Sequence, residues 1–273
     1  MKKGIIWIAS YPKSGNTLLR LFLSHYLHGD GKELNFDLLK NVPKFETKKV
    51  FSSVLHNVSL GENFNYIKHC LDVQKKLIQK LPQEKLIFKT HHFFGHINGH
   101  YFTNKENTLG FIYLIRDPRE IAVSYANHTK SSINDIIEIL TQKSKITPVE
   151  WETKLNWELQ YKSWKAFESV PSLFIKYEDL VSNQSEVLSF IVKFFVNLTG
   201  TTYDSQKIKE TIELIKFSNL QKKEKFEGFS EIGKDRTFFR SGKFNTWKEI
   251  LNKKQIKEIE TNLSDLMKKL NYT

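Results

Sequence analysis

The sequence predicts an α/β fold, a single domain in which a central parallel β-sheet is flanked by helices on both faces. Four short runs of apolar and β-branched residues have the unbroken hydrophobicity of strands buried on both faces, and they lie at 4–9, 85–89, 109–115 and 173–177. Helical periodicity separates these runs, and strands that alternate with helices form parallel sheets covered on both sides. Ligands of such sheets bind beyond the carboxyl ends of the strands.

The helices are predicted from apolar residues that recur with a period close to 3.6. Seven segments show this pattern, at 17–27, 67–81, 120–127, 150–167, 185–195, 205–215 and 248–270. The stretch 28–65 has little periodicity and holds scattered glycines and prolines. It is either a region that covers the substrate or a plain surface excursion.

Composition favours one domain that spans 1–273. The chain of 273 residues is 40% apolar, has only six prolines, and contains neither an internal repeat nor a Gly/Ser-rich linker. The single cysteine, Cys70, excludes an internal disulfide framework, and no signal peptide precedes the first strand, so we expect a cytoplasmic protein. The most apolar helical stretch, 188–198, is too short to span a bilayer and contains Lys193, so no transmembrane segment is expected.

The net charge of +12 favours an anionic partner, which could be nucleic acid, an acidic membrane surface or a phosphate-bearing small molecule. Its lysines are scattered along polar helix faces, and no basic tail, zinc-finger pattern or RNP pattern is present. We therefore expect no specific nucleic-acid partner.

The turn after the first strand, in the stretch SYPKSGNTLL at 10–19, has the character of an anion site. Backbone N–H groups of a strand-to-helix turn and the positive end of the following helix together cradle anionic oxygens. Lys13 adds a mobile charge, and Ser14, Asn16 and Thr17 add donors. The nucleotide-hydrolase P-loop, G-x-x-x-x-G-K-S/T, is absent because the lysine precedes Gly15, so the usual hydroxyl ligand for Mg²⁺ is missing.

Further motifs follow the later strands. Lys89-Thr90-His91 ends the second strand and Arg116 ends the third, with Ser124 eight residues later. Tyr177-Glu178-Asp179 follows the fourth strand, and Arg240-Ser241-Gly242 precedes Trp247-Lys248 near the end of the chain.

Together, these five motifs resemble those of the sulfotransferases that use 3′-phosphoadenosine 5′-phosphosulfate (PAPS), in the family's order over roughly residues 4–250. The resemblance implies a P-loop-like strand-loop-helix that binds the 5′-phosphosulfate, and a transfer of the sulfuryl group to a hydroxyl or amine of a small molecule without a metal. It also implies the residues that bind the donor: Lys13, Ser14, Gly15, Asn16, Thr17, Arg116, Ser124, Tyr177, Phe217, Arg240, Ser241 and Gly242. Among these, Arg116, Ser124 and Arg240 would hold the 3′-phosphate, and Tyr177 and Phe217 the adenine.

Two positions depart from the family pattern. Leu18 stands where many animal members have a tryptophan near the adenine, and Ser241 replaces a lysine of the 3′-phosphate site. Lys243 is a candidate to compensate for that charge. The departures favour a bacterial or viral relative.

Three residues are predicted to be catalytic. His91 is the candidate general base, because a histidine has an ordinary pKa near neutrality, and His92 is its rival, since a slip of one residue reverses the face of a strand. Lys13 would stabilise charge on the departing oxygen, and Lys89 would hold the sulfonate or 5′-phosphate. His91, His92, His96 and His100 lack the spacing of a zinc site, so we expect no metal.

The acceptor is expected to be an apolar or aromatic alcohol. This expectation depends on aromatic residues that could line a pocket: Phe93, Phe94, Tyr101, Phe102, Tyr125 and Phe238. Because the chain has 21 phenylalanines, core packing is the better expectation for any single one of them. No recognisable motif marks the acceptor itself.

Two other functions compete with this interpretation. A P-loop-type kinase or phosphotransferase would explain the opening turn and use Asp117 as a metal ligand, although Asp117-Pro118 is also a good helix opening. A basic nucleic-acid-binding or scaffold protein is supported by the charge alone.

Overall fold

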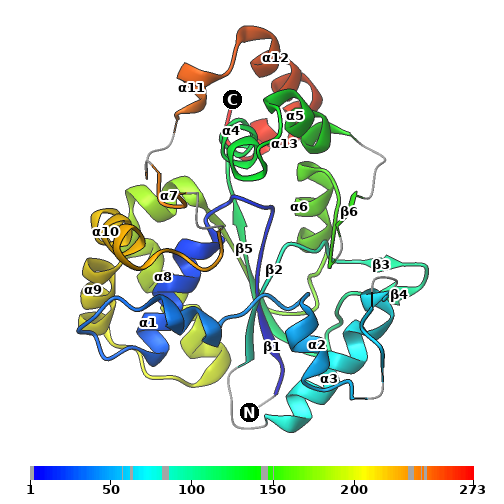
Figure 1. Ribbon diagram of the computed structural model, residues 1–273, viewed down its shortest axis with the longest axis vertical. Helices are drawn as coiled ribbons and strands as arrows, with labels where there is room; N and C mark the ends of the chain where they lie inside the picture. Colours follow the sequence, from blue (N-terminus) through cyan, green and yellow to red (C-terminus); the bar gives the residue numbers. More distant parts are fainter. Residues whose placement is uncertain are drawn as a thin grey trace.

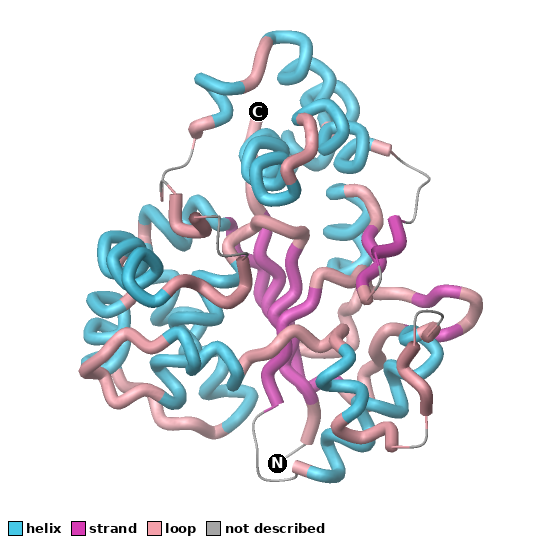
Figure 2. The backbone as a smooth tube through the Cα atoms, viewed as in Figure 1, coloured by secondary structure: helices cyan, strands magenta, loops and turns pink. Residues whose placement is uncertain are grey.

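A parallel four-stranded sheet forms the centre of the molecule. The computed structural model describes residues 3–56, 58–61, 64–81, 86–142, 147–149, 151–232, 237–240, 242 and 245–273. The sheet contains β1 (Ile5–Ser10), β2 (Leu86–Thr90), β5 (Thr108–Ile115) and β8 (Ser172–Lys176), in the spatial order β2-β1-β5-β8. All of the neighbouring strands are parallel, which confirms the predicted α/β fold and its four strands (Figures 1 and 2).

Alternate residues of each strand serve two hydrophobic cores. Ile6, Ile8 and Ile112 pack against one helical layer, which is formed by α1 (Asn16–His28), α8 (Gln184–Thr199), α9 (Ser205–Leu214) and α10 (Phe217–Glu227). The opposite face packs against α2 (Lys48–Ser52), α3 (Cys70–Lys80), α4 (Pro118–Thr129), α5 (Ile133–Thr141), α6 (Trp157–Lys165), α12 (Lys253–Asn262) and α13 (Ser264–Lys269). Figure 1 shows α1, α8, α9 and α10 on one side of the sheet, α2, α3 and α6 on the other, and α4, α5, α12 and α13 at the top of the view.

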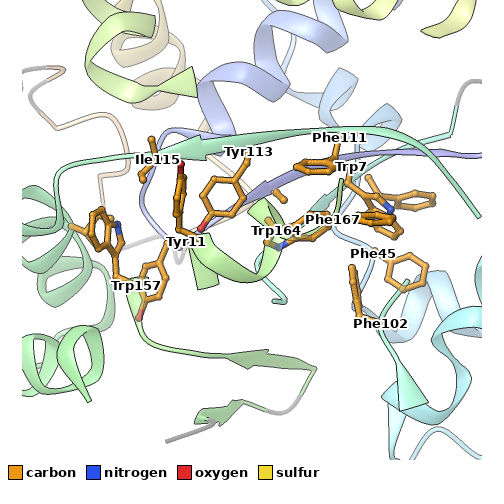
Figure 3. Packing of buried hydrophobic residues seen from close by; sticks show 14 of the residues in the cluster. Trp7, Tyr11, Phe45, Phe102, Phe111, Tyr113, Ile115, Trp157, Trp164 and Phe167 are labelled. Atoms are coloured by element: carbon orange, nitrogen blue, oxygen red, sulfur yellow. The ribbon is translucent and has the colours of Figure 1, made fainter. Parts of the chain in front are cut away.

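Large aromatic side chains fill the second of these cores (Figure 3). The ring of Trp7 lies edge-on to Phe45 at 5.2 Å between centroids and 5.0 Å from Phe102. On the neighbouring strand, Phe111 lies 5.0 Å from Trp164 of α6. Because these rings are fully buried, they fix the position of the chain around Phe45 relative to the sheet.

The aperiodic stretch 28–65 has local structure of its own. It contains the 3₁₀ helix η1 (Phe36–Asn41) and the short helix α2. Between them, the Lys89 amide donates to the Pro43 carbonyl at 2.9 Å, and the Phe45 amide donates to the Lys89 carbonyl at 3.0 Å. Lys44 is thereby paired with Lys89 in a parallel bridge, so this stretch extends the sheet beside the end of β2.

The prediction of one continuous helix over 150–167 is wrong for the first part of this range. An antiparallel hairpin of β6 (Thr147–Val149) and β7 (Glu152–Lys154) comes first, and α6 begins only at Trp157. The side chain of Asn156 accepts a hydrogen bond from the Leu159 amide at 2.7 Å and so caps α6. Pro148 and its β-branched neighbours favour an extended chain over a helix.

The expected helix over 248–270 is divided. It consists of α11 (Trp247–Ile250), α12 and α13, and Asn252 starts α12 with a capping box completed by Gln255. Among the described residues, four α-helices were not predicted: α2, α5, α10 and the short α7 (Tyr177–Ser182). Smaller elements are η2 (Tyr66–His69) and the hairpin of β3 (His96–Ile97) and β4 (His100–Tyr101). Among the described helices, none combines the length and hydrophobicity needed to cross a membrane.

Candidate active site

A cavity of about 560 Å³ opens beyond the carboxyl ends of β1, β2 and β5, where the motifs predicted it. Most of the predicted site residues line it: Lys13, Gly15, Asn16, Thr17, Lys89, His91, Arg116, Ser124, Tyr177, Phe217, Arg240 and Gly242. Ser14 is buried and does not line the cavity. Ser241 and Lys243 lie outside the described residues.

The turn between β1 and α1 has two residues in the left-handed backbone region. Lys13 has a φ of 67° and Gly15 a φ of 92°. The Arg116 guanidinium donates to the Lys13 carbonyl at 2.9 Å, which fixes the turn to the end of β5. A Cβ on Gly15 would lie 2.3 Å from Cδ2 of Tyr177, so the tyrosine ring packs directly against the glycine.

Asn16 has a structural contact in addition to its place in the cavity. Its side-chain amide donates to the Ile8 carbonyl at 3.0 Å and to Ser10 Oγ at 3.2 Å, so it ties the start of α1 back to β1. This helix begins at Asn16 beside the cavity, and its N-terminal N–H groups carry partial positive charge. The turn therefore has the geometry of an anion cradle.

Lys13 lies in a strongly cationic environment. Burial lowers its pKa, and the neighbouring charges of Lys89, Arg116 and Arg240 lower it further, so that the pKa of Lys13 is about 8 despite the opposing effect of Glu231. Its ammonium lies 4.5 Å from the centroid of the Phe238 ring. A bound anion would relieve this repulsion between cations.

His91 is oriented by contacts with β1. Its Nδ1 lies 2.9 Å from the Ser10 carbonyl oxygen and 3.1 Å from Ser10 Oγ. Donation of Nδ1–H to the carbonyl makes Nε2 the basic nitrogen of the neutral ring. Gln160 of α6 donates to the His91 carbonyl at 2.6 Å and so fixes its backbone.

His92, the rival base, lies in the aromatic core and does not line the cavity. Its ring stacks on Phe102 at 4.6 Å and on Phe93 at 4.7 Å between centroids. His96 and His100 belong to the separate β3–β4 hairpin. Within the described part of the chain, no three metal-binding side chains form a group.

Arg116 connects several of the predicted donor-binding residues. Its guanidinium lies 4.2 Å from the centroid of Tyr177 and donates to Glu120 at 3.2 Å. Glu120 in turn accepts from the Trp247 amide at 3.0 Å, which joins the C-terminal motif to α4. Ser124 lies further along α4 and lines the same cavity.

Phe217, at the start of α10, supports the chain near Gly242. A Cβ on Gly242 would lie 2.7 Å from the Phe217 ring. Leu18 and Phe217 both line the cavity, so an apolar surface is available there for a base. Arg240 is exposed at the cavity.

Comparison with known proteins identifies the family. The sulfotransferase domain family matches residues 3–271. The chain belongs to the sulfotransferase family. The resemblance that the motifs predicted is therefore confirmed, and so is the enzyme class.

Two curated sulfotransferases are similar to most of the chain. Cytosolic sulfotransferase 6 of Arabidopsis thaliana is 24% identical, with 93% of this chain and 76% of the relative covered. Sulfotransferase 1B1 of Canis lupus familiaris is 27% identical, with 79% of this chain and 67% of the relative covered.

Solved structures of the family share the fold. A retinol dehydratase in complex with androsterone and the inactive cofactor PAP has a TM-score of 0.65 at 19% identity. The match covers 97% of this chain and 80% of the dehydratase chain. Mouse sulfotransferase SULT7A1 complexed with PAP has a TM-score of 0.59 at 16% identity. This match covers 98% of the present chain and 85% of the mouse chain.

The position of Asp117 in this sulfotransferase disfavours the competing role of metal ligand. Asp117 caps α4 by accepting from the Arg119 amide at 2.9 Å, and it pairs with the Arg119 guanidinium at 2.7 Å. It does not line the cavity. The alternative interpretation of Asp117-Pro118 as a helix opening is confirmed.

The aromatic residues expected at the acceptor are mostly elsewhere. Phe93 and Phe102 are buried in the core, Phe94 stacks on Phe167 at 4.0 Å, and Tyr101 lies on the β3–β4 hairpin. Only Tyr125 and Phe238 of that set line the cavity.

Several cavity residues were not predicted from the sequence. They are Lys44, His128, Thr129, Lys154 and Glu231. Glu231 accepts from Arg20 at 2.5 Å and from Thr17 at 3.4 Å. Burial opposes its ionisation, but Lys89 and Arg20 outweigh that effect and hold the pKa of Glu231 below its ordinary value. The sequence signals were weak, since each residue stands outside any motif.

Proposed function

We propose that this sulfotransferase moves a sulfuryl group from PAPS to a hydroxyl or amine of a small molecule, with His91 as the general base. The observation that supports this most is the 2.9 Å contact between His91 Nδ1 and the Ser10 carbonyl oxygen, which implies that Nδ1 carries the proton and Nε2 is basic, in a residue that lines the same cavity as Lys13 and Lys89. A base at this place contributes about 10² to 10⁴ in rate in other enzymes.

The cavity residues fit an anionic donor. Lys13, Lys89, Arg116 and Arg240 supply positive charge, and the N-terminus of α1 supplies backbone donors. We assign Lys13, Gly15, Asn16 and Thr17 to the 5′-phosphosulfate, and leave out Ser14 because it is fully buried and does not line the cavity. Arg116, Ser124, Arg240, Ser241 and Gly242 are assigned to the 3′-phosphate, and Tyr177 with Phe217 to the adenine.

The chemistry requires few groups from the protein. PAPS supplies the sulfuryl group. His91 Nε2 takes the proton of the acceptor hydroxyl or amine as the bond between the acceptor and sulfur forms. Lys13 stabilises the electron pair left on the bridging oxygen when its bond to sulfur breaks, and Lys89 orients the sulfonate.

Small molecules are the acceptors that we propose. The retinol dehydratase structures contain androsterone or retinol, both of which carry a hydroxyl group. We also propose that residues 1–273 act as one domain in the cytoplasm.

The donor is tested by calorimetric titration with 3′-phosphoadenosine 5′-phosphate (PAP) and with ATP, each with and without Mg²⁺. We expect PAP to bind without the metal and ATP to bind more weakly. Preference for ATP with Mg²⁺ would instead support the kinase interpretation.

The base is tested by the substitution His91→Ala. We expect transfer to fall by at least about 10² while the Kd for PAP changes little, because the base acts on the acceptor. His96→Ala on the β3–β4 hairpin is the matched control and keeps its activity. Normal turnover in His91→Ala would assign the base to another residue.

A further inference from the structure

A carboxylate lies among the residues that we assign to the 5′ end of the donor. Glu231 lines the cavity together with Lys13, Thr17 and Lys89, although it belongs to none of the donor motifs. Those three residues are the ones assigned to the 5′-phosphosulfate and its sulfonate. We propose that the Glu231 carboxylate is an internal competitor of the donor: it holds this end of the site, and PAPS or its product PAP displaces it on binding.

The contact between Glu231 and Thr17 makes the competition direct. Thr17 Oγ1 donates to a carboxylate oxygen of Glu231 at 3.4 Å. A hydroxyl group has a single O–H to donate. Thr17 therefore cannot donate to Glu231 and to an oxygen of the phosphosulfate at the same time, and the donor must take over a hydrogen bond that the protein already makes.

The charges around Glu231 are also those that would bind the donor. Burial opposes the ionisation of Glu231, but Lys89 and Arg20 hold its pKa below the ordinary value, so the carboxylate is charged at neutral pH. In the other direction, Glu231 raises the pKa of Lys13 against the larger effect of burial. Two anions that share the same lysines repel each other, so a donor binds less tightly while the carboxylate is present.

Glu231 is held in this position by buried contacts. Its other carboxylate oxygen accepts from the Arg20 guanidinium at 2.5 Å, and Arg20 Nε donates to the Val42 carbonyl at 2.7 Å. Two residues before Glu231, the buried ring of Phe229 packs on Phe36 at 5.0 Å between centroids. Arg20 keeps its contact with Val42 when the carboxylate moves, so displacement does not leave the guanidinium without an acceptor.

This inference rests on the proposed function and is tested by Glu231→Gln, which removes the charge and keeps the size of the side chain. Calorimetry with PAP is done at about pH 6.5, below the pKa of Lys13. We expect PAP to bind at least about fivefold more tightly, because a nearby negative charge is lost. Inhibition of the PAPS reaction by PAP should become stronger by the same factor. A merely structural role of Glu231 predicts the opposite sign, since loss of the Arg20 pair would weaken the site.

A ligand control shows which end of the donor competes with the carboxylate. Adenosine 3′-phosphate has the adenine and the 3′-phosphate of PAP but no 5′-phosphate. Since it does not reach Thr17 in the proposed site, we expect its Kd in Glu231→Gln to stay near that of the unsubstituted protein.

Glu260→Gln is the matched protein control. Glu260 also accepts from a buried guanidinium at 2.5 Å, that of Arg119, but it lies outside the described lining of the cavity. The substitution removes the same charge from the same kind of pair. We expect the Kd for PAP to be nearly unchanged.

A second variant, Glu231→Asp, keeps the charge beside Arg20 and shortens the reach toward Thr17. We expect a smaller gain in PAP affinity than in Glu231→Gln, and this variant decides if Glu231→Gln does not fold. Unchanged or weaker PAP binding in the folded variants, or an equal gain for adenosine 3′-phosphate, would overturn the inference. Failure of the unsubstituted protein to bind PAP would be a different result, because it would contradict the proposed function itself.

Discussion

At the scale of single residues, the turn after β1 concentrates strain and charge at the same place. Lys13 has a left-handed backbone, which costs a residue with a side chain about 1 to 3 kcal/mol. The contact of Arg116 with the Lys13 carbonyl helps to hold that conformation. The result is a buried ammonium among other cations, with a pKa of about 8. The turn is therefore arranged for an anion before any anion binds.

This pKa predicts how donor binding depends on pH. Since PAP favours the charged form of Lys13, its affinity should be greatest below pH 8 and fall as the pH rises through that value, by up to about tenfold per unit. Titration calorimetry from pH 7 to 10 measures the profile. In Lys13→Met, binding should be weaker and the profile much flatter. A flat profile in the unsubstituted protein would contradict the role of Lys13.

Gly15 allows a second test at this scale. Gly15→Ala would place a Cβ 2.3 Å from the Tyr177 ring, so we expect PAP to bind at least about tenfold more weakly. Gly99→Ala is a matched control, because Gly99 also has a positive φ but no atom within 4 Å of its virtual Cβ. Gly99→Ala should cost about 1 to 2 kcal/mol of unfolding free energy for its positive φ, and Gly15→Ala should cost more, because the Tyr177 ring must also move. Equal PAP binding by the two variants would show that the contact with Tyr177 is unimportant.

At the scale of elements, the sequence predicted strands better than helix boundaries. Three strands of the central sheet, β1, β2 and β5, are buried along almost their whole length, so their apolar runs are continuous and easy to find. Helix boundaries depend on single capping side chains, such as Asn156 before α6 and Asn252 before α12, which periodicity does not detect. Lys44 was missed for a related reason, since its place depends on a bridge to Lys89, which is distant in sequence.

The start of α4 gives a prediction for an element. Asp117→Asn keeps a side-chain cap but removes the charge that pairs with the buried Arg119 guanidinium. We expect urea unfolding to show a loss of about 1.5 to 3 kcal/mol, whereas the Kd for PAP, with or without Mg²⁺, stays nearly unchanged. Loss of activity at full stability would assign Asp117 to the reaction and favour the kinase interpretation.

At the scale of the whole molecule, one cavity draws on segments from Pro12 to Thr246. The strands run from the N-terminal end of the molecule toward α4, and their carboxyl ends bring these segments together (Figure 1). The motifs predicted segments that line this cavity together, because the strand ends of a parallel sheet converge. The net charge of +12 alone did not distinguish a phosphosulfate site from a nucleic-acid surface.

The dependence of binding on salt concentration distinguishes a phosphosulfate site from a nucleic-acid surface. Binding to a nucleic acid through 6 to 10 phosphates loses about 10³ to 10⁵ in affinity between 50 and 200 mM salt. Within the described lining, PAP would instead meet a few cations in a partly enclosed cavity, where screening is weaker. We therefore expect the Kd for PAP to rise by less than about tenfold over this range, and binding of a single-stranded oligonucleotide to disappear. Fluorescence anisotropy with a labelled oligonucleotide and calorimetry with PAP, in the same buffers, measure both. Oligonucleotide binding that persists at 200 mM salt while PAP fails to compete would show that the surface charge has a partner of its own.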